Sequence, residues 1–90
     1  MKSLNQVHLN GLRAVEAVAR LGSLQAAADE FGVSIGAISQ QIIKTEHQLG
    51  RTLFERTSRG MVPVETAAGV LSRLQDGFRQ LAGAVALAQK

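Results

Sequence analysis

The sequence contains no cysteine, tryptophan or tyrosine, and it has one proline among its 90 residues. Without cysteine, neither a disulfide framework nor a thiolate metal site can form. Three phenylalanines are the only aromatic residues, so we expect a core built mainly from Leu, Ile, Val and Ala. No apolar run approaches the roughly 18 residues that a membrane span requires. We therefore expect one small domain that does not enter a membrane.

Residues that carry catalytic chemistry are also scarce. His8 and His47 lie far apart, and no cluster of acidic residues accompanies either one, so we interpret both as surface residues. No nucleophile–base pair, paired carboxylates or phosphate-binding glycine loop can be identified. We therefore expect a protein that is not an enzyme and that binds no metal and no cofactor.

Charge and the start of the chain bear on partner and location. The formal net charge is +3 and the sequence pI is about 10.2, a balance that suits an anionic partner such as nucleic acid. Many small domains carry a similar excess, so this signal is weak by itself. The segment Met1–Gln6 lacks the apolar block of a signal peptide, and we expect a cytoplasmic protein.

The most informative stretch reads as a helix, a tight turn and a second helix. Ser23 can cap the first of these helices, over about 24–31, and Gly32 lies where it must stop. Ser34 can cap the second, over about 35–49. Polar caps and a glycine between two apolar-periodic segments are typical of a helix-turn-helix. In such a unit the second helix enters the major groove of DNA.

Two further elements surround this unit. A helix over about 11–21 is predicted before it, capped by Asn10 and ended by Gly22, because its apolar residues recur with helical spacing. Residues 51–65 then change to two short extended segments around a turn-like stretch. Pro63 confines the returning segment to a sheet edge or a strand end. We interpret this region as a β-hairpin, a wing attached to the helix-turn-helix.

A long final helix is predicted over about 67–89, with Thr66 as its cap. Its larger apolar residues recur at alternating intervals of three and four positions, which is a heptad seam. These seam residues are Leu71, Leu74, Phe78, Leu81 and Val85. We expect a dimer through this seam; the alternative is that the seam packs only on its own domain. The chain then divides into a DNA-binding domain, 1–66, and a dimerisation helix, 67–90.

One core cluster is expected to hold the first four elements together. Its predicted members are Leu12, Val15, Leu24, Ala27, Ala28, Phe31, Val33, Ile38, Ile42, Leu49, Leu53 and Phe54.

Several blocks follow one another in a fixed order: Gly22-Ser23-Leu24, Ala26-Ala27-Ala28, Val33-Ser34, Ala37-Ile38-Ser39, Leu49-Gly50, Leu53-Phe54-Glu55-Arg56 and Thr66-Ala67-Ala68-Gly69. Together they resemble the N-terminal domain of LysR-type transcriptional regulators. The resemblance implies a mainly α winged helix-turn-helix, with three helices and a small hairpin wing, followed by a long dimerising linker helix. It also implies double-stranded DNA as partner, a homodimer through antiparallel C-terminal helices and a tetramer in the full-length parent.

Family members also carry a C-terminal effector-binding module. This chain ends at Lys90, and we expect it to be an isolated DNA-binding domain.

Candidate contact residues come from the spacing and from the resemblance together. The N-terminal turns of the 35–49 helix should face base edges, and Ser39 and Gln40 match family positions that contact DNA. Lys44 is one turn further along that face and is expected to meet phosphate. The wing is expected at the minor groove or the flanking backbone. The predicted contact residues are Gln25, Ser34, Ile35, Gly36, Ser39, Gln40, Lys44, Arg56 and Arg59, with Arg51 as a weaker phosphate candidate.

The sequence departs from the family at the start of this helix. The family usually has Gln-Pro after the serine of the turn, and here Ile35 and Gly36 follow it. Isoleucine cannot hydrogen-bond a base, but its methyl groups can touch a thymine methyl. Thr45 also stands where the family usually has an apolar residue.

Three hypotheses follow for function. The first is sequence-specific DNA binding by a dimeric bacterial transcription regulator on an interrupted A·T-rich palindrome. The second is a protein-interaction module that keeps the same shape, which the low basicity of the 35–49 helix slightly favours. The third, an enzyme, has no supporting motif.

Overall fold

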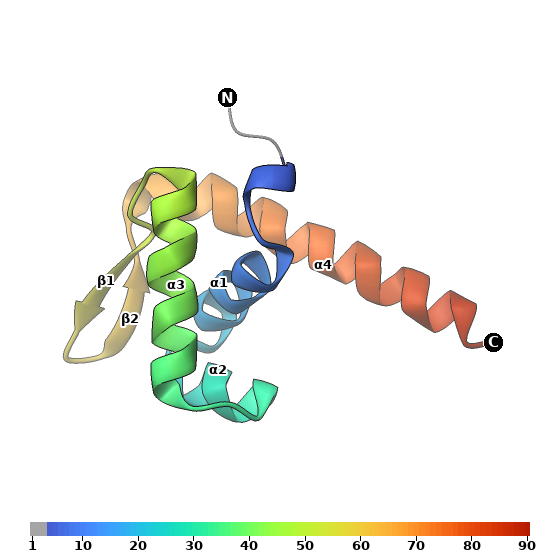
Figure 1. The fold of residues 1–90 in the computed structure, drawn as a ribbon, viewed down its shortest axis with the longest axis horizontal. Helices are drawn as coiled ribbons and strands as arrows, with labels where there is room; N and C mark the ends of the chain where they lie inside the picture. The colour runs from blue at the N-terminus through green and yellow to red at the C-terminus, as the bar shows by residue number, and fades with distance from the viewer. Residues whose placement is uncertain (1–3) are drawn as a thin grey trace.

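The structure is a computed structural model that describes residues 4–90. Its elements are a 3-10 turn Leu4–Gln6, α1 Leu9–Leu21, α2 Leu24–Phe31, α3 Ile35–Leu49, β1 Phe54–Thr57, β2 Gly60–Pro63, a 3-10 turn Glu65–Ala67 and α4 Ala68–Ala88. Figure 1 shows α1, α2 and α3 gathered beside the hairpin, while α4 crosses them and extends away. The predicted fold, a winged helix-turn-helix followed by a long helix, is confirmed.

Two expectations from the sequence concern the cellular location of the protein and its relation to a membrane. Part of the Met1–Gln6 segment, on which the cytoplasmic expectation depends, lies outside the described residues. Within residues 4–90, no helix combines the length and the apolar character needed to cross a lipid bilayer.

The helix-turn-helix forms as its capping residues predict. The Oγ of Ser23 accepts a hydrogen bond from the amide of Ala26 at 2.9 Å, and the Oγ of Ser34 accepts one from the amide of Ala37 at 3.1 Å. Gly32 ends α2 with φ 67°, a left-handed conformation that favours glycine. The predicted bounds of α2 and α3 are confirmed at both ends.

The predicted cap of α1 is wrong. The helix begins at Leu9 after His8, whose side chain makes no capping bond, and Asn10 lies inside the first turn. The amide of His8 instead donates to Oε1 of Gln48 on α3 at 3.2 Å. A tertiary contact therefore accompanies the start of α1, while its predicted end at Gly22 is confirmed.

The predicted cap of α4 is also wrong. Thr66 lies within the 3-10 turn, and α4 begins at Ala68 without a side-chain cap. Ala67, the residue between them, is fully buried in the core. The carbonyl of Thr66 accepts a hydrogen bond from Nη2 of Arg51 at 3.2 Å. The start of the last helix therefore coincides with the burial of one small apolar side chain.

The wing is a two-stranded antiparallel hairpin in which Phe54 pairs with Pro63 and Thr57 pairs with Gly60. The Thr57 hydroxyl closes the tip, because its Oγ1 donates to the carbonyl of Gly60 at 3.2 Å and accepts from the amide of Arg59 at 3.1 Å. Pro63 ends β2, as predicted. The hairpin itself was therefore predictable from the sequence.

The core lies where α1, α2, α3 and the base of the wing meet. Its buried members are Ala14, Val15, Ala17, Val18, Leu24, Ala27, Ala28, Ile38, Ile42, Leu53, Phe54 and Ala67. Leu12 is buried as expected, and Phe31 and Leu49 are half-buried at its edge. Val33 was predicted in the core, but its side chain is 46% exposed. Its amide completes the end of α2 by donating to the carbonyl of Ala28 at 3.0 Å, and its side chain faces outward.

A glycine sets the approach of α1 to α3. Gly11 on α1 lies against Thr45 of α3, and a Cβ at position 11 would overlap the Thr45 hydroxyl. Thr45 is 1% exposed, and its Oγ1 donates to the carbonyl of Gln41 at 2.7 Å. The hydroxyl is therefore satisfied within α3, and the two helices can pack closely.

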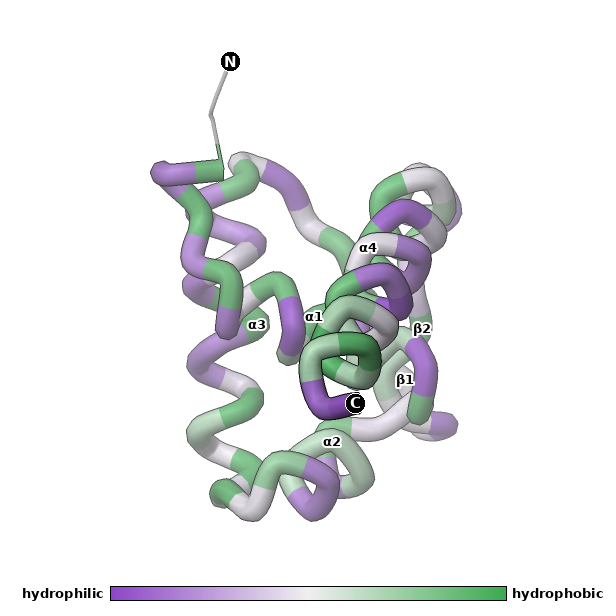
Figure 2. Tube along the Cα trace, turned by 90° about the vertical axis from the view of Figure 1, so that its right-hand side faces the viewer, coloured by the Kyte–Doolittle hydropathy of each residue, from purple (hydrophilic) through white to green (hydrophobic). Residues whose placement is uncertain are grey.

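The two halves of α4 have different surroundings. Val70, Leu71 and Leu74 pack against the core, whereas Leu81 and Val85 are 50% and 57% exposed. Figure 2 looks along α4 from its C-terminal end and shows that end standing clear of α3. The predicted dimer seam is thus divided: Leu71 and Leu74 pack on their own domain, Phe78 is half-buried, and Leu81 and Val85 are exposed.

Candidate nucleic-acid interface

One face of α3 is buried and the opposite face is free. Ile38, Ile42 and Thr45 are at most 3% exposed and turn toward the core. Each residue advances about 100° around a helix, so a row of other residues points away from the core. That row is Gly36, Gln40, Ile43 and His47, all exposed. Figure 2 shows α3 along one side of the molecule, with α1 and α4 between it and the strands of the wing.

The structure brings five predicted contact residues together at the start of α3. Ser34 is its cap, and the others occupy its first two turns. Although the Ser34 oxygen accepts from Ala37, its hydroxyl hydrogen is still available to a base or a phosphate. Ile35 is 43% exposed. Gln40 is exposed and Ser39 is half-buried. The exposed turns therefore present two hydrogen-bonding side chains, a half-buried hydroxyl and one apolar side chain.

Three of the predicted contact residues are exposed cations on α3 and on the wing. Lys44 lies one turn beyond Gln40 on α3, Arg56 is on β1, and Arg59 is at the tip of the wing. All three cations are exposed, and none forms an ion pair within residues 4–90. Their charge is therefore uncompensated by nearby carboxylates and can attract an anionic partner.

Two other predicted residues have bonds inside the protein. The Nε2 of Gln25, in the first turn of α2, donates to Oδ1 of Asp29 at 2.9 Å. This bond directs the amide nitrogen, which is the group suited to phosphate, along the helix. Arg51 is held by its bond to the carbonyl of Thr66. Each side chain keeps further N–H donors that can contact DNA, but its internal bond restricts the direction in which they point.

The sequence interpretation missed three residues of this region. Ile43, 58% exposed, and His47 extend the outward row of α3. Ile43 and His47 are three and seven residues after Gln40, so helical spacing places them on its face, away from the buried stripe of Ile38, Ile42 and Thr45, and could have revealed them. Glu46, the third, bonds the connection between α3 and the wing, which helical spacing does not reveal.

Glu46 joins α3 to the wing. Its Oε2 accepts hydrogen bonds from the amide of Leu53 at 2.6 Å and from the amide of Phe54 at 3.3 Å. Leu53 is fully buried, and Phe54 is the first residue of β1. The carboxylate therefore fixes the strand that leads into the wing against the helix with the exposed row.

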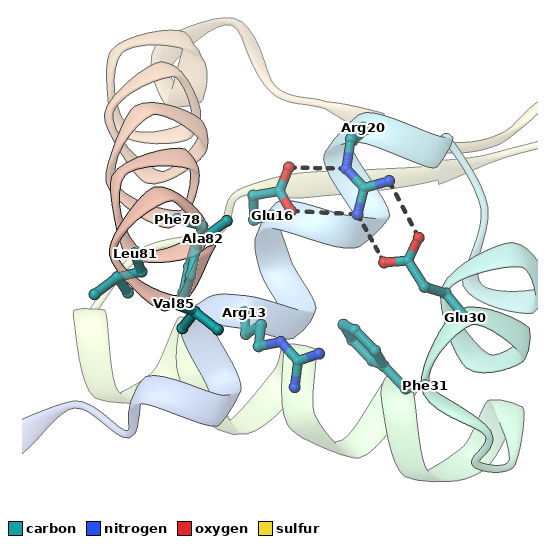
Figure 3. A pocket seen from close by; sticks show the side chains of 9 residues that line it. All are labelled: Arg13, Glu16, Arg20, Glu30, Phe31, Phe78, Leu81, Ala82 and Val85. Carbon is teal, nitrogen blue, oxygen red and sulfur yellow. Dashed lines mark hydrogen bonds and ion pairs between the residues drawn. The ribbon is translucent and has the colours of Figure 1, made fainter. Parts of the chain in front are cut away.

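A groove of about 460 Å³ lies on another side of the molecule, between α1, α2 and the far half of α4 (Figure 3). Three of the predicted dimerisation residues, Phe78, Leu81 and Val85, form its α4 wall. On the opposite wall, the guanidinium of Arg13 lies over the ring of Phe31, 4.5 Å from the ring centre. The groove is thus apolar on one side and carries a cation on an aromatic ring on the other.

Arg20 ties α1 to α2 beside this groove. Its Nη2 donates to Oε2 of Glu30 at 2.7 Å, and its Nε donates to Oε2 of Glu16 at 3.1 Å. The hydrogen bond from Arg20 lowers the pKa of Glu30. The same bonds, that of Glu30 first, raise the pKa of Arg20. Figure 3 shows both carboxylates converging on this one guanidinium.

A match to a known protein family agrees with this geometry. Residues 9–70 match the family described as bacterial regulatory helix-turn-helix protein, lysR family. The chain belongs to this family. The resemblance noted in the sequence, to the N-terminal winged helix-turn-helix domain of LysR-type regulators, is thereby confirmed.

Individual relatives agree. The transcriptional activator AmpR of Citrobacter freundii is 43% identical over 77 residues, which cover 86% of this chain and 26% of AmpR. The transcriptional regulator TrpI of Pseudomonas aeruginosa is 40% identical over 78 residues, covering 87% of this chain and 26% of TrpI. The chain therefore spans about a quarter of the length of these relatives, which are named as transcription regulators and not as enzymes.

A solved structure gives the same answer for the fold. The CbnR DNA-binding domain, solved as a DNA complex, superposes with a TM-score of 0.76 at 29% identity, covering 92% of this chain and 94% of that one.

Proposed function

We propose that this chain is a sequence-specific reader of double-stranded DNA that acts as a dimer on an interrupted A·T-rich palindrome. The observation that carries the proposal is the exposed start of α3, together with the exposed cations Lys44, Arg56 and Arg59, which form no ion pair within residues 4–90. The CbnR relative, whose solved complex contains DNA, supports the same partner.

In this proposal α3 enters the major groove, which is wide enough for a helix. Gln40 can bond an adenine edge through two hydrogen bonds, Ser39 can bond a neighbouring base, and Ile35 can contact a thymine methyl. Ser34 and Gly36 bring the backbone close to the DNA. Lys44 and Gln25 serve the phosphates.

The wing is assigned to the minor groove. Arg59 projects from the hairpin tip and Arg56 from β1. A narrow A·T-rich minor groove concentrates negative potential and attracts arginine. The wing therefore adds affinity and a preference for DNA shape, while α3 reads the bases.

We assign the dimer contact to the far half of α4. Phe78, Leu81 and Val85 are the seam residues that do not belong to the core. A second copy with its α4 antiparallel would cover them and hold two recognition helices at two half-sites. Such half-sites are separated by about one helical turn of DNA or a multiple of it. Residues 1–66 then read DNA and residues 67–90 dimerise, in the cytoplasm, and the longer parent would carry the effector-binding module and form tetramers.

The test starts from a random-sequence duplex library, from which the chain selects its preferred site. Fluorescence anisotropy then compares that duplex with a scrambled one across a salt series. We expect a preference of about a thousandfold and a steep fall of affinity with salt. Weak, equal and salt-independent binding to both duplexes would contradict the proposal and favour a protein-interaction module.

Matched variants assign the roles. Gln40→Ala should relax discrimination at one base pair by about 1–3 kcal/mol, while Gln80→Ala on exposed α4 should change nothing. Arg59→Ala should weaken binding to all sequences and reduce the salt slope by about one unit. Arg79→Ala, which removes an exposed charge from α4, is the control for that slope.

A further inference from the structure

The connection between α3 and the wing is organised around one residue. The main-chain carbonyl of Glu46 accepts from the amides of Gly50 and Arg51, at 2.9 and 3.1 Å, and so closes the end of α3. The side-chain carboxylate of the same residue accepts from the amides of Leu53 and Phe54, at 2.6 and 3.3 Å. Four amides on the path from helix to wing are therefore held by Glu46.

These bonds reach both arms of the hairpin. Leu53, whose amide bonds the carboxylate, accepts through its own carbonyl from the amide of Val64 at 2.9 Å. Val64 directly follows β2. Glu46 is thus connected to the outgoing strand by its side chain, and through Leu53 to the returning strand.

The wing also contacts the rest of the domain away from Glu46: Phe54 is buried in the core, and Met61 and Val64 pack against it. At its far end Gly60, with φ 110°, lies so close to the Gly22 carbonyl that a Cβ would come within 2.7 Å of that oxygen. The wing is therefore held to the core and to α1, and the carboxylate of Glu46 adds hydrogen bonds from α3 to the base of its first strand.

We propose that Glu46 is a positioning residue, whose carboxylate orients the wing relative to α3 so that Arg56 and Arg59 engage DNA while α3 occupies the major groove. This inference rests on the proposed DNA-binding function. Glu46 touches no base in this account; it acts through the hairpin. A carboxylate near a DNA-facing surface repels phosphate, so the negative charge of Glu46 alone would oppose DNA binding. Its acceptor oxygen favours binding, because it holds the amides at the base of the wing.

The chain offers a matched pair of variants that separates these two effects. Glu46→Gln removes the charge but keeps an oxygen that can accept from both amides. Glu46→Ala removes the charge and the acceptor together. We expect Glu46→Ala to bind the selected duplex about tenfold more weakly than Glu46→Gln, which corresponds to about 1.4 kcal/mol. Its salt slope should also be shallower by about one to two units, since two arginines lose their contacts.

A double-mutant cycle shows whether the effect travels through the wing. Both Glu46 variants are combined with the Arg56→Ala, Arg59→Ala pair, and all proteins are measured below their melting temperatures. The difference between Glu46→Ala and Glu46→Gln should disappear in that background. The proposal is overturned if the difference between the two Glu46 variants persists at full size when both arginines are replaced. It is also overturned if the two variants bind DNA equally when both arginines are present.

A measurement without DNA keeps this inference separate from the proposed function. Trypsin cleaves after Arg56 and Arg59, so we expect faster cleavage in the wing of Glu46→Ala than of Glu46→Gln. Equal rates would overturn the positioning role even if the wild type binds DNA. If the wild type selects no DNA, the proposed function fails, and the cleavage comparison still decides whether Glu46 orients the wing. Should Glu46→Ala not fold, Glu46→Asp, which keeps the charge on a shorter side chain, is compared with the wild type in the same assays.

Discussion

The two halves of α4 share one heptad pattern but have different surroundings. Val70, Leu71 and Leu74 pack against the core of their own domain, while Leu81 and Val85 are half or more exposed along the open groove. The spacing of apolar residues therefore identifies the face of the helix and not the partner of that face. The first half stabilises the domain, and the second half is free to join it to another copy.

The largest effect is expected where the seam is part of the core. Leu74→Asp places a charge against the apolar interior and removes a packed side chain, and should destabilise the fold by about 3 kcal/mol or more. Urea denaturation followed by circular dichroism measures this. Leu87→Asp, at a side chain that is 71% exposed, is the matched control. A wild-type midpoint for Leu74→Asp would show that the first half of α4 does not support the core.

Substitutions in the exposed half of α4 should weaken dimerisation without destabilising the fold. Leu81→Asp together with Val85→Asp should leave the helical circular dichroism unchanged but weaken dimerisation at least about a hundredfold, or ~2.7 kcal/mol. Sedimentation equilibrium measures the dissociation constant. A variant that still sediments as a dimer would exclude this seam as the interface.

Gly77 and Gly83 can test whether a second copy packs on the exposed half of α4. Within residues 4–90, no atom that would obstruct a Cβ at either position lies within 4 Å of it. In the monomer each change to Ala should stabilise the helix by about 1 kcal/mol. If a partner helix crosses closely at Gly83, then Gly83→Ala should instead weaken the dimer. Thermal melting at low and high protein concentration separates the two effects, and stabilisation at both concentrations argues against a close crossing there.

The smallest effect is expected at the ion pair beside the groove. Because Arg20 lowers the pKa of Glu30, the pair stabilises the fold above the pKa of Glu30 in the unfolded chain, about 4.3. That contribution is lost as the pH falls through the lower pKa of the folded state. Glu30→Gln should cost about 0.2–1 kcal/mol at pH 7, since the pair is exposed. Urea midpoints should differ from wild type at pH 7 and converge in acid; a difference that persists in acid would contradict this account.

Local signals predicted most of the fold. Ser23, Gly32 and Ser34 act within a few residues of themselves, and for that reason the bounds of α2 and α3 could be predicted from the sequence. Asn10 and Thr66 looked equally suitable as caps, yet α1 and α4 begin elsewhere. Those starts coincide with a bond to Gln48 and with burial of Ala67, contacts between distant parts of the chain that no local pattern reveals.

In the candidate site too, features that follow from local sequence were predictable, and features that depend on distant contacts were not. The resemblance and the helical spacing led to the start of α3 and to the arginines of the wing, because exposure along one helix follows from periodicity. The role of Glu46 could not be predicted, since the amides that it binds belong to a connection whose path exists only in three dimensions. The bond between Gln25 and Asp29, by contrast, joins residues four apart on one helix, a spacing that permits such a bond and is visible in the sequence.

The contact between Gly11 and Thr45 has a consequence for how the sequence of this domain can vary. A side chain at position 11 and the hydroxyl at position 45 compete for the same space, so the two positions share a single volume. A larger residue at position 11 therefore requires a smaller one at position 45, whereas a smaller residue at position 45 meets no such overlap. In a library randomised at both positions, folded members should lack the combination of a side chain at position 11 with a residue as large as threonine at position 45.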